Sequence, residues 1–208
     1  MLQDVLWTGI DEPTMEHLHL QEVGSSIIAD GVVVGLAASR PLRLSYVLHC
    51  DQHYQVEQVA IRLLTPPRRT IALRHRGDGQ WTDKRGSLLP QLSGCSDLDI
   101  AVTPFTNTLP IRRLALAPGA AAVIAVAYVE VPSLALRVAP QRYTCLRWTA
   151  QGAVYRFESL DSDFTADVEV DAAGLVVTYP GLFQRQWSSP VEMRVGGLDR
   201  RSEEEHPR

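Results

Sequence analysis

Hydrophobic and polar residues alternate along most of the 208-residue chain, with the period of two that is typical of half-buried β-strands. The pattern is clearest between Leu42 and Asp51 and again between Phe164 and Val170, where apolar side chains occupy every second position. Such strands have one dry and one wet face, as antiparallel sheets permit. A helical period of 3.6 appears nowhere, so we predict an all-β antiparallel meander with few or no long helices.

Turn signals separate the predicted strands. Asp78-Gly79 between two extended runs is a strong hairpin signal, because both residues adopt positive φ at low cost. Further turns are expected at Pro140, at Gln151-Gly152 and at 172–174. The predicted strands cover 7–10, 16–22, 26–36, 42–51, 56–64, 69–76, 97–103, 111–116, 120–131, 134–138, 141–148, 153–159, 164–170 and 175–179.

The segment from Gly94 to Leu114 contains more unusual side chains than any other part of the chain. Alternation over 97–103 predicts a strand that places Asp97, Asp99 and Thr103 on one face. Two carboxylates would then share a surface, so a functional site is sought here first.

Two prolines follow, Pro104 and Pro110, and each favours extended geometry in the residue before it. The stretch between them is therefore expected to be an irregular connection. A second strand over 111–116 would direct Arg112 and Arg113 to opposite faces, so that at most one arginine joins the two carboxylates.

The run from Ala120 to Val131 is apolar and rich in alanine, a composition that also suits a helix. Its β-branched residues and the Pro118-Gly119 turn before it favour a buried strand instead. The same run would also serve as an interface strand in a homodimer, and the sequence does not separate these two roles.

The length and the net charge of the chain limit its domain organisation and the partners that it is expected to bind. We interpret residues 1–195 as a single β domain and residues 196–208 as a flexible charged tail. The net charge of −4 and the absence of long basic runs argue against nucleic acid as a partner. No transmembrane segment and no export signal are recognisable, so we expect a cytoplasmic protein.

Cys50, Cys95 and Cys145 are odd in number and widely spaced, which indicates buried reduced thiols. His17 and His19 lie two apart on one predicted strand face, but zinc requires three or four ligands and no third ligand is near. His49, Asp51 and His53 are close in sequence, but a turn expected at 52–54 would point the three side chains in different directions. No cofactor or metal is therefore expected.

The most basic region comprises five arginines on two predicted strands and the connection between them: Arg62, Arg68, Arg69, Arg74 and Arg76. We interpret these arginines as a solvated positive face. A site for an anionic headgroup is the alternative.

The sequence Gly-Cys-Ser-Asp-Leu-Asp at 94–99, followed by Thr-Pro-Phe-Thr-Asn-Thr-Leu-Pro-Ile-Arg-Arg-Leu at 103–114, resembles the signature of a bacterial family of unknown function labelled as glycolipid-binding. Asp78-Gly79-Gln80-Trp81 and the segment 141–143 also fit, and the resemblance covers nearly the whole chain. It implies a single large curved antiparallel sheet, similar to the half-barrels of bacterial lipoprotein carriers. No ligand-binding residues are established for that family, so the resemblance assigns none in this sequence.

The first function hypothesis is a non-catalytic binding protein that holds an amphipathic, glycolipid-like ligand on the concave face of the sheet. Carboxylates, amides and guanidinium groups suit sugar hydroxyls, and aromatic rings stack on sugars. The candidate residues are Asp97, Asp99, Asn107, Arg112, Arg113, Trp81 and Tyr143. A carboxylate paired with an arginine that only fixes the loop is the structural alternative.

Two other functions stay open. The first is a homo-oligomeric assembly module built on 120–131. The second is a hydrolase that uses Asp97 and Asp99 as acid and base, since residues i and i+2 of a strand lie about 6.6 Å apart, within the range of glycosidase carboxylates. No recognisable catalytic motif accompanies that pair, so we do not expect an enzyme.

Overall fold

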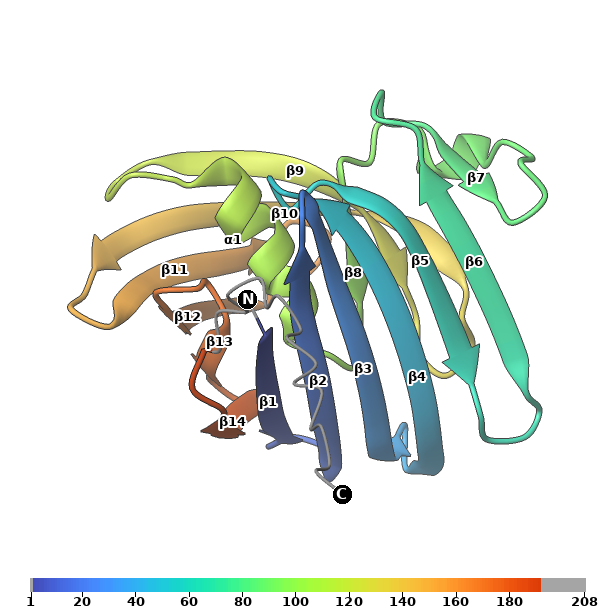
Figure 1. Ribbon diagram of the computed structural model, residues 1–208, viewed down its shortest axis with the longest axis horizontal. Helices are drawn as coiled ribbons and strands as arrows, with labels where there is room; N and C mark the ends of the chain where they lie inside the picture. The colour runs from blue at the N-terminus through green and yellow to red at the C-terminus, as the bar shows by residue number, and fades with distance from the viewer. Residues whose placement is uncertain (1, 192–208) are drawn as a thin grey trace, which may run out of the picture.

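The computed structural model describes residues 2–191, which form one 14-stranded sheet with a single short α-helix (Figure 1). Sheet accounts for 59% of the structure and helix for 7%, so the predicted all-β class without long helices is confirmed. The strand order is β7-β6-β5-β4-β3-β2-β1-β14-β13-β12-β11-β10-β9-β8. The sheet is open and consists of two meanders that meet where β1 pairs with β14. The predicted tail, 196–208, lies outside the described residues.

Each meander is built from strands that follow one another in sequence. The first contains β1 (Leu2–Gly9), β2 (Thr14–Val23), β3 (Ser26–Ala37), β4 (Arg40–Asp51), β5 (Val56–Leu63), β6 (Arg69–His75) and β7 (Trp81–Asp83). The second contains β9 (Ala121–Val129), β10 (Leu136–Trp148), β11 (Gly152–Ser159), β12 (Thr165–Asp171), β13 (Val176–Tyr179) and β14 (Phe183–Ser188). The short strand β8 (Asp97–Ile100) pairs with β9 in parallel, and all other pairs are antiparallel.

The predicted alternation matches the burial of side chains. In β4 the apolar set faces the interior, and the alternate set faces outward. The buried members are Leu42, Leu44, Tyr46, Leu48 and Cys50. Residues 121–129 of the run 120–131 form the strand β9, as the β-branched residues predicted, and not a helix.

The turn expected at Pro140 is wrong, because β10 continues through this residue as one strand of 13 residues. Pro140 faces Ala125 of β9, and its carbonyl accepts a hydrogen bond from the N–H of Leu160. Leu160 lies one residue beyond the end of β11. The hydrogen bond that proline cannot donate would therefore lie at the end of the β10–β11 ladder, where its loss costs little stability.

The prediction for 97–116 is wrong in part. The first strand stops at Ile100, and the expected connection contains a 3₁₀ turn, η2 (Phe105–Asn107). The expected second strand, 111–116, is wrong, because residues 111–114 belong to the helix α1 (Thr108–Leu114). Pro110 lies in the first turn of α1, where the missing N–H has no intrahelical partner to lose. The helix ends at Ala115, which adopts a left-handed φ of 44°.

Residues 97–114, here called the inner segment, lie inside the curve of the sheet (Figure 1). Phe105 stacks on Tyr46 of β4 with ring centroids 6.5 Å apart. On the other side, the hydroxyl of Thr108 donates to the carbonyl of Gly174, between β12 and β13, at 2.9 Å. The concave face expected to hold a ligand is therefore largely filled by the protein itself.

Residues 94–96 also connect the two ends of the open sheet. The N–H of Gly94 donates to the carbonyl of Gly79, and the N–H of Ser96 donates to the carbonyl of Ala125 in β9, both at 2.9 Å. A Cβ atom on Gly79 would lie 3.2 Å from the Cα atom of Gly94, so the close approach of the two backbones favours glycine. The indole of Trp81 strengthens this contact by donating to the carbonyl of Cys95.

The apolar core is divided into two clusters. The larger one lies under β1–β5 and includes Leu98, Phe105 and Leu109 of the inner segment. The smaller one lies within the second meander and receives Ile111 from α1. The inner segment is thus the shared wall between the two clusters.

All three cysteines are free and buried. Burial raises the pKa of the Cys95 thiol to about 11 and raises the pKa of Cys50 further. Because the thiolate is the reactive form, both groups are chemically protected in the folded protein.

Thiol titration without reductant should therefore find three free groups per chain after denaturation, and a much slower reaction before it. A single reactive thiol in the denatured chain would indicate a disulfide and contradict the structure.

Candidate ligand-binding site

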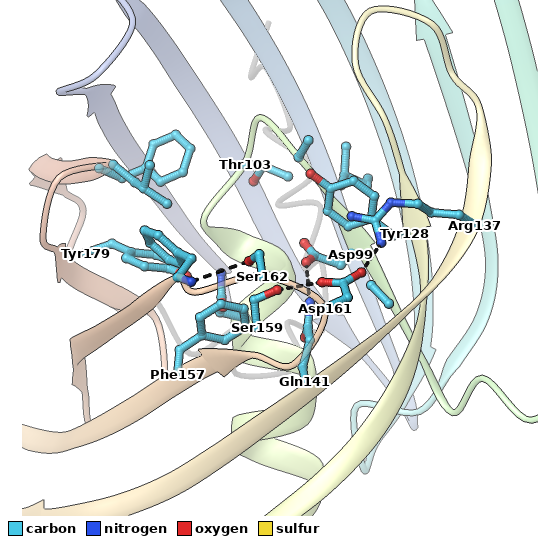
Figure 2. Close-up of a pocket in the computed structure, with 17 residues that line it drawn as sticks. Asp99, Thr103, Tyr128, Arg137, Gln141, Phe157, Ser159, Asp161, Ser162 and Tyr179 are labelled. Atoms are coloured by element: carbon cyan, nitrogen blue, oxygen red, sulfur yellow. Dashed lines mark hydrogen bonds and ion pairs between the residues drawn. The ribbon is translucent and has the colours of Figure 1, made fainter.

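A cavity of about 440 Å³ lies between the inner segment and the second meander (Figure 2). The inner segment contributes one wall, which includes Asp99, Thr103 and Asn107. The strands β9, β10, β11, β13 and β14 contribute the remainder together with their connections. In Figure 2 Phe157 and Tyr179 lie on one side, with carboxylates between them and Arg137. The cavity has a volume typical of small-molecule sites.

Asp99 provides the main polar group of the cavity wall. Its Oδ1 accepts a hydrogen bond from the hydroxyl of Thr106 at 2.9 Å, and its Oδ2 accepts one from the Nε2 of Gln141 at 2.7 Å. Burial raises the pKa of Asp99, and the two hydrogen bonds act in the opposite direction. The carboxylate is thus fixed in orientation while its remaining lone pairs stay available.

Aromatic rings form the opposite wall. Phe157 lies 6.0 Å from both Phe164 and Tyr179 between ring centroids, and Tyr179 lies 6.3 Å from Phe183. These rings come from β11, the β11–β12 connection, β13 and β14. Phe164 is 37% exposed, so the wall is accessible from solvent.

Arg137 and Asp161 border the cavity as an ion pair with an N–O distance of 2.5 Å. The guanidinium also lies over the ring of Tyr128, 4.3 Å from its centroid. A hydrogen bond from Ser159 and the charge of Arg137 lower the pKa of Asp161. A charged, half-exposed group therefore lies beside the aromatic wall.

The seven predicted site residues do not converge on one surface. Asp99 and Asn107 line the cavity, and Tyr143 lies behind them, where its hydroxyl donates to the Oδ1 of Asn107 at 2.9 Å. The other four lie elsewhere: Asp97, Arg113, Arg112 and Trp81.

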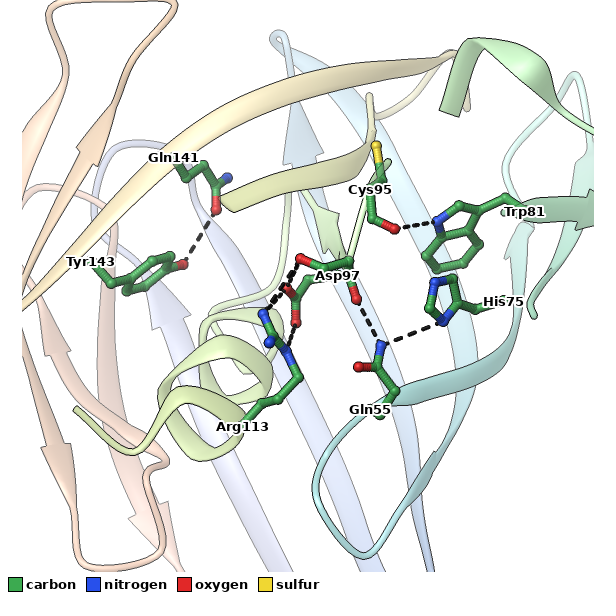
Figure 3. Close-up of polar contacts among 9 residues, drawn as sticks. Gln55, His75, Trp81, Cys95, Asp97, Arg113, Gln141 and Tyr143 are labelled. Carbon is green, nitrogen blue, oxygen red and sulfur yellow. Dashed lines mark hydrogen bonds and ion pairs between the residues drawn. The ribbon is translucent and has the colours of Figure 1, made fainter. Parts of the chain in front are cut away.

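Asp97 and Arg113 form a buried ion pair (Figure 3). The Nε of Arg113 donates to Oδ1 at 3.0 Å and its Nη2 donates to Oδ2 at 2.5 Å. The side chain of Asp97 is completely buried, whereas that of Arg113 is 20% exposed. The pair ties α1 to β8, so the structural alternative holds for Asp97, and the Asp97–Asp99 pair does not share the cavity.

Trp81 is buried near the far end of the sheet, where its ring lies 4.9 Å from that of His75 (Figure 3). Arg112 is exposed and lies over the ring of Tyr54 at 5.1 Å. Both residues therefore contact other parts of the protein and not the cavity.

Four important cavity residues were not anticipated: Arg137, Gln141, Phe157 and Tyr179. The alternation of β10 places Gln141 on the same face as Tyr143, and this is the signal that would have identified Gln141. The same alternation places Arg137 on that face. Phe157 and Tyr179 come from strands whose neighbours in space depend on the whole topology.

Glu16 is a buried carboxylate next to the cavity wall. Its Oε1 accepts hydrogen bonds from the hydroxyls of Tyr46 at 2.6 Å and of Thr103 at 2.7 Å, and its Oε2 has no hydrogen-bond partner among residues 2–191. Burial raises the pKa of Glu16 to about 7, although the hydrogen bonds from Tyr46 and Thr103 act in the opposite direction. Thr103 lines the cavity, so Glu16 fixes one of its walls to β2.

No group of three or more His, Cys, Asp or Glu residues within 2–191 is arranged to hold a metal ion. His17 and His19 instead both contact the Oδ1 of Asp4, at 2.9 and 2.8 Å. No helix in the same range combines the length and apolar character needed to cross a bilayer.

The two adjacent arginines of α1 allow a matched test of the ion pair. Arg113→Met leaves the carboxylate of Asp97 buried without a cation and should lower the free energy of unfolding by about 3 to 5 kcal/mol. Arg112→Met removes an exposed cation–π contact and should cost about 1 kcal/mol or less. Urea unfolding of both variants measures the difference, and equal losses would show that the pair has no special structural role.

Glu16 should make stability depend on pH. The native carboxyl titrates at about 7, and the ordinary value is 4.5. The unfolded chain therefore loses its proton first as the pH rises. Relative to Glu16→Gln, the wild type should lose up to about 3 kcal/mol between pH 4.5 and 7, and the loss should then level off. Chemical unfolding across this range checks the slope, and a pH-independent difference between the two proteins would contradict it.

Comparisons with known proteins agree with the resemblance seen in the sequence. The crystal structure of a DUF1089 family protein from Pseudomonas aeruginosa superposes with a TM-score of 0.73 at 36% identity, covering 83% of this chain and 91% of that chain. None of the curated proteins matches the sequence. The family model described as "Putative glycolipid-binding" matches residues 4–185, and the chain therefore belongs to this family.

Proposed function

We propose that the protein binds an amphipathic, sugar-bearing ligand in the cavity at Asp99 and releases it unchanged. The observation that carries the proposal is an oriented carboxylate facing an aromatic wall across a space of about 440 Å³. The family description and the fold of its Pseudomonas relative are consistent with such a ligand.

The polar side of the cavity suits sugar hydroxyls. Asp99 offers lone pairs that Thr106 and Gln141 leave free, and a carboxylate is a strong acceptor for hydroxyl donors. Arg137 and Asp161 at the border supply both a donor and an acceptor within one ion pair. Sugars present both kinds of group around each ring, so this combination fits them better than a purely apolar molecule.

The aromatic side suits the apolar parts of the same ligand. Ring faces such as those of Phe157 and Phe164 pack against the C–H face of a sugar or against an alkyl chain. The inner segment lies inside the curve of the sheet and takes up space that an acyl chain would otherwise use (Figure 1). We therefore assign the cavity to the headgroup and the first part of the tail.

Conversion of the ligand is not part of the proposal. Asp97, the partner that a two-carboxylate hydrolase would use with Asp99, has both oxygens bound by Arg113. Its side chain is fully buried and does not line the cavity. Asp97 is therefore not available as the partner of Asp99, and the second carboxylate that lines the cavity, Asp161, is paired with Arg137.

Homodimer formation is a second candidate, favoured by the edge of β9. The strand β8 pairs with Val126 to Val129, and Ser96 donates to the carbonyl of Ala125, so residues 121–124 form a partly uncovered edge, and Val123 is 59% exposed. Exposed edges of this kind pair readily with a second chain. This role and ligand binding are compatible.

The binding proposal is tested with two detergents that share an alkyl chain, dodecyl maltoside and dodecylphosphocholine, each kept below its micelle concentration. Calorimetric titration should show tighter binding of the maltoside. Asp99→Asn should weaken that binding by about 10- to 100-fold, the range expected for a hydrogen bond to a charged group. Asp167→Asn, which alters an exposed carboxylate on β12, is the matched control and should bind normally.

Phe164→Leu separates sugar stacking from tail packing. It preserves apolar area but removes the ring, so maltoside binding should weaken several-fold if the ring contacts the sugar. Unchanged affinity for the maltoside would show that the aromatic wall contacts the alkyl tail of the ligand and not its sugar. No binding of either detergent, together with no lipid in a mass-spectrometric extract of the purified protein, would overturn the proposal.

A further inference from the structure

A second hollow, of about 370 Å³, lies on the outer face of β4, β5 and β6, on the side of the sheet away from the inner segment. Three residues in register across these strands, Val47, Ala60 and Ala72, form its floor. Two of the three are alanines, and their short side chains leave a depression between the longer side chains at either end. The hollow is separate from the cavity at Asp99, with which it shares no lining residue.

Cations surround this floor. Arg62 lies at one end and Arg74 at the other. Lys84 follows Asp83, the residue opposite Leu73, and lies on the β7 side of the hollow. No carboxylate lines the hollow, and these three cations form no ion pair with any residue in the range 2–191. Three positive charges therefore face one small space without compensation from the protein.

Arginines on the second meander are paired differently from those around the hollow. Arg142 lies opposite Glu158, and Arg156 lies opposite Asp167 at 2.8 Å, so these arginines are matched by a carboxylate on the neighbouring strand. Such cross-strand pairs are the usual arrangement for charges on a sheet.

The arginines of the hollow have neutral neighbours instead. Arg74 lies opposite Gln58 and Thr82, and Arg62 lies opposite Ser45 and Thr70. The unpaired state of these cations therefore follows from the identity of their cross-strand neighbours.

The spacing allows the side chains to converge. Arg62 is four residues along β5 from Gln58, the residue opposite Arg74, which corresponds to about 13 Å along the strands. Arginine and lysine side chains are long enough to reach over the alanine floor from both ends. A phosphate group carries up to two negative charges and several acceptor oxygens, and guanidinium groups bind it through paired hydrogen bonds.

We propose that this hollow binds a phosphate group, carried either by a soluble phosphate compound or by a phospholipid headgroup. The site is independent of the sugar-binding cavity. Failure of one proposal therefore leaves the other standing.

The test compares two kinds of arginine on the outer face. Inorganic pyrophosphate is titrated into the full chain and followed by amide NMR shifts, which should concentrate at Ala60 and Ala72. The double variant Arg74→Gln with Lys84→Gln should weaken the affinity at least tenfold. Arg156→Gln removes a cation that has a carboxylate partner, and it should leave the affinity within twofold of the wild type.

Vesicles identify the source of the phosphate. Binding to vesicles that contain phosphatidic acid, but not to pure phosphatidylcholine, and loss of that binding in the double variant would assign the site to lipid headgroups. Binding of pyrophosphate alone would assign it to soluble compounds. The proposal is overturned if neither probe binds, or if Arg156→Gln reduces binding as much as the double variant.

Discussion

The structure depends on the burial of one charged group, the carboxylate of Asp97. A carboxylate without solvent is costly unless a cation and hydrogen bonds compensate it, and Arg113 supplies both through two contacts. The pair holds α1 against β8 and so keeps the inner segment inside the curve of the sheet. Together with the contacts of Thr103, Phe105 and Thr108, the pair positions the cavity residues of that segment.

Two aspartates that lie two positions apart on one short strand have therefore acquired different roles. Asp97 is saturated by Arg113, whereas Asp99 is held by neutral donors, Thr106 and Gln141. Neutral donors orient a carboxylate without cancelling its charge. The first residue stabilises the fold, and the second keeps the capacity to interact with something that enters the cavity.

The sequence was informative wherever a strand has one wet and one dry face. The alternation between Leu42 and Asp51 predicted the buried side of β4 because burial there repeats with the pleat. The helix α1 gave no comparable signal, since seven residues span only two turns and Pro110 argues for extended geometry. Its formation depends on contacts distant in sequence, such as that between Thr108 and Gly174. The cavity was only partly foreseeable for the same reason, because Phe157 and Tyr179 approach Asp99 through topology and not through spacing.

The pairing of β1 with β14 has a consequence for how the protein is made. The two strands occupy the centre of the sheet order, although they lie near opposite ends of the sequence (Figure 1). A growing chain on the ribosome completes the first meander early, but β1 keeps an open row of N–H and C=O groups until residues 183–188 emerge. A chain that stops short of β14 thus exposes an edge in the middle of the sheet, where a neighbouring nascent chain is able to add its own strand.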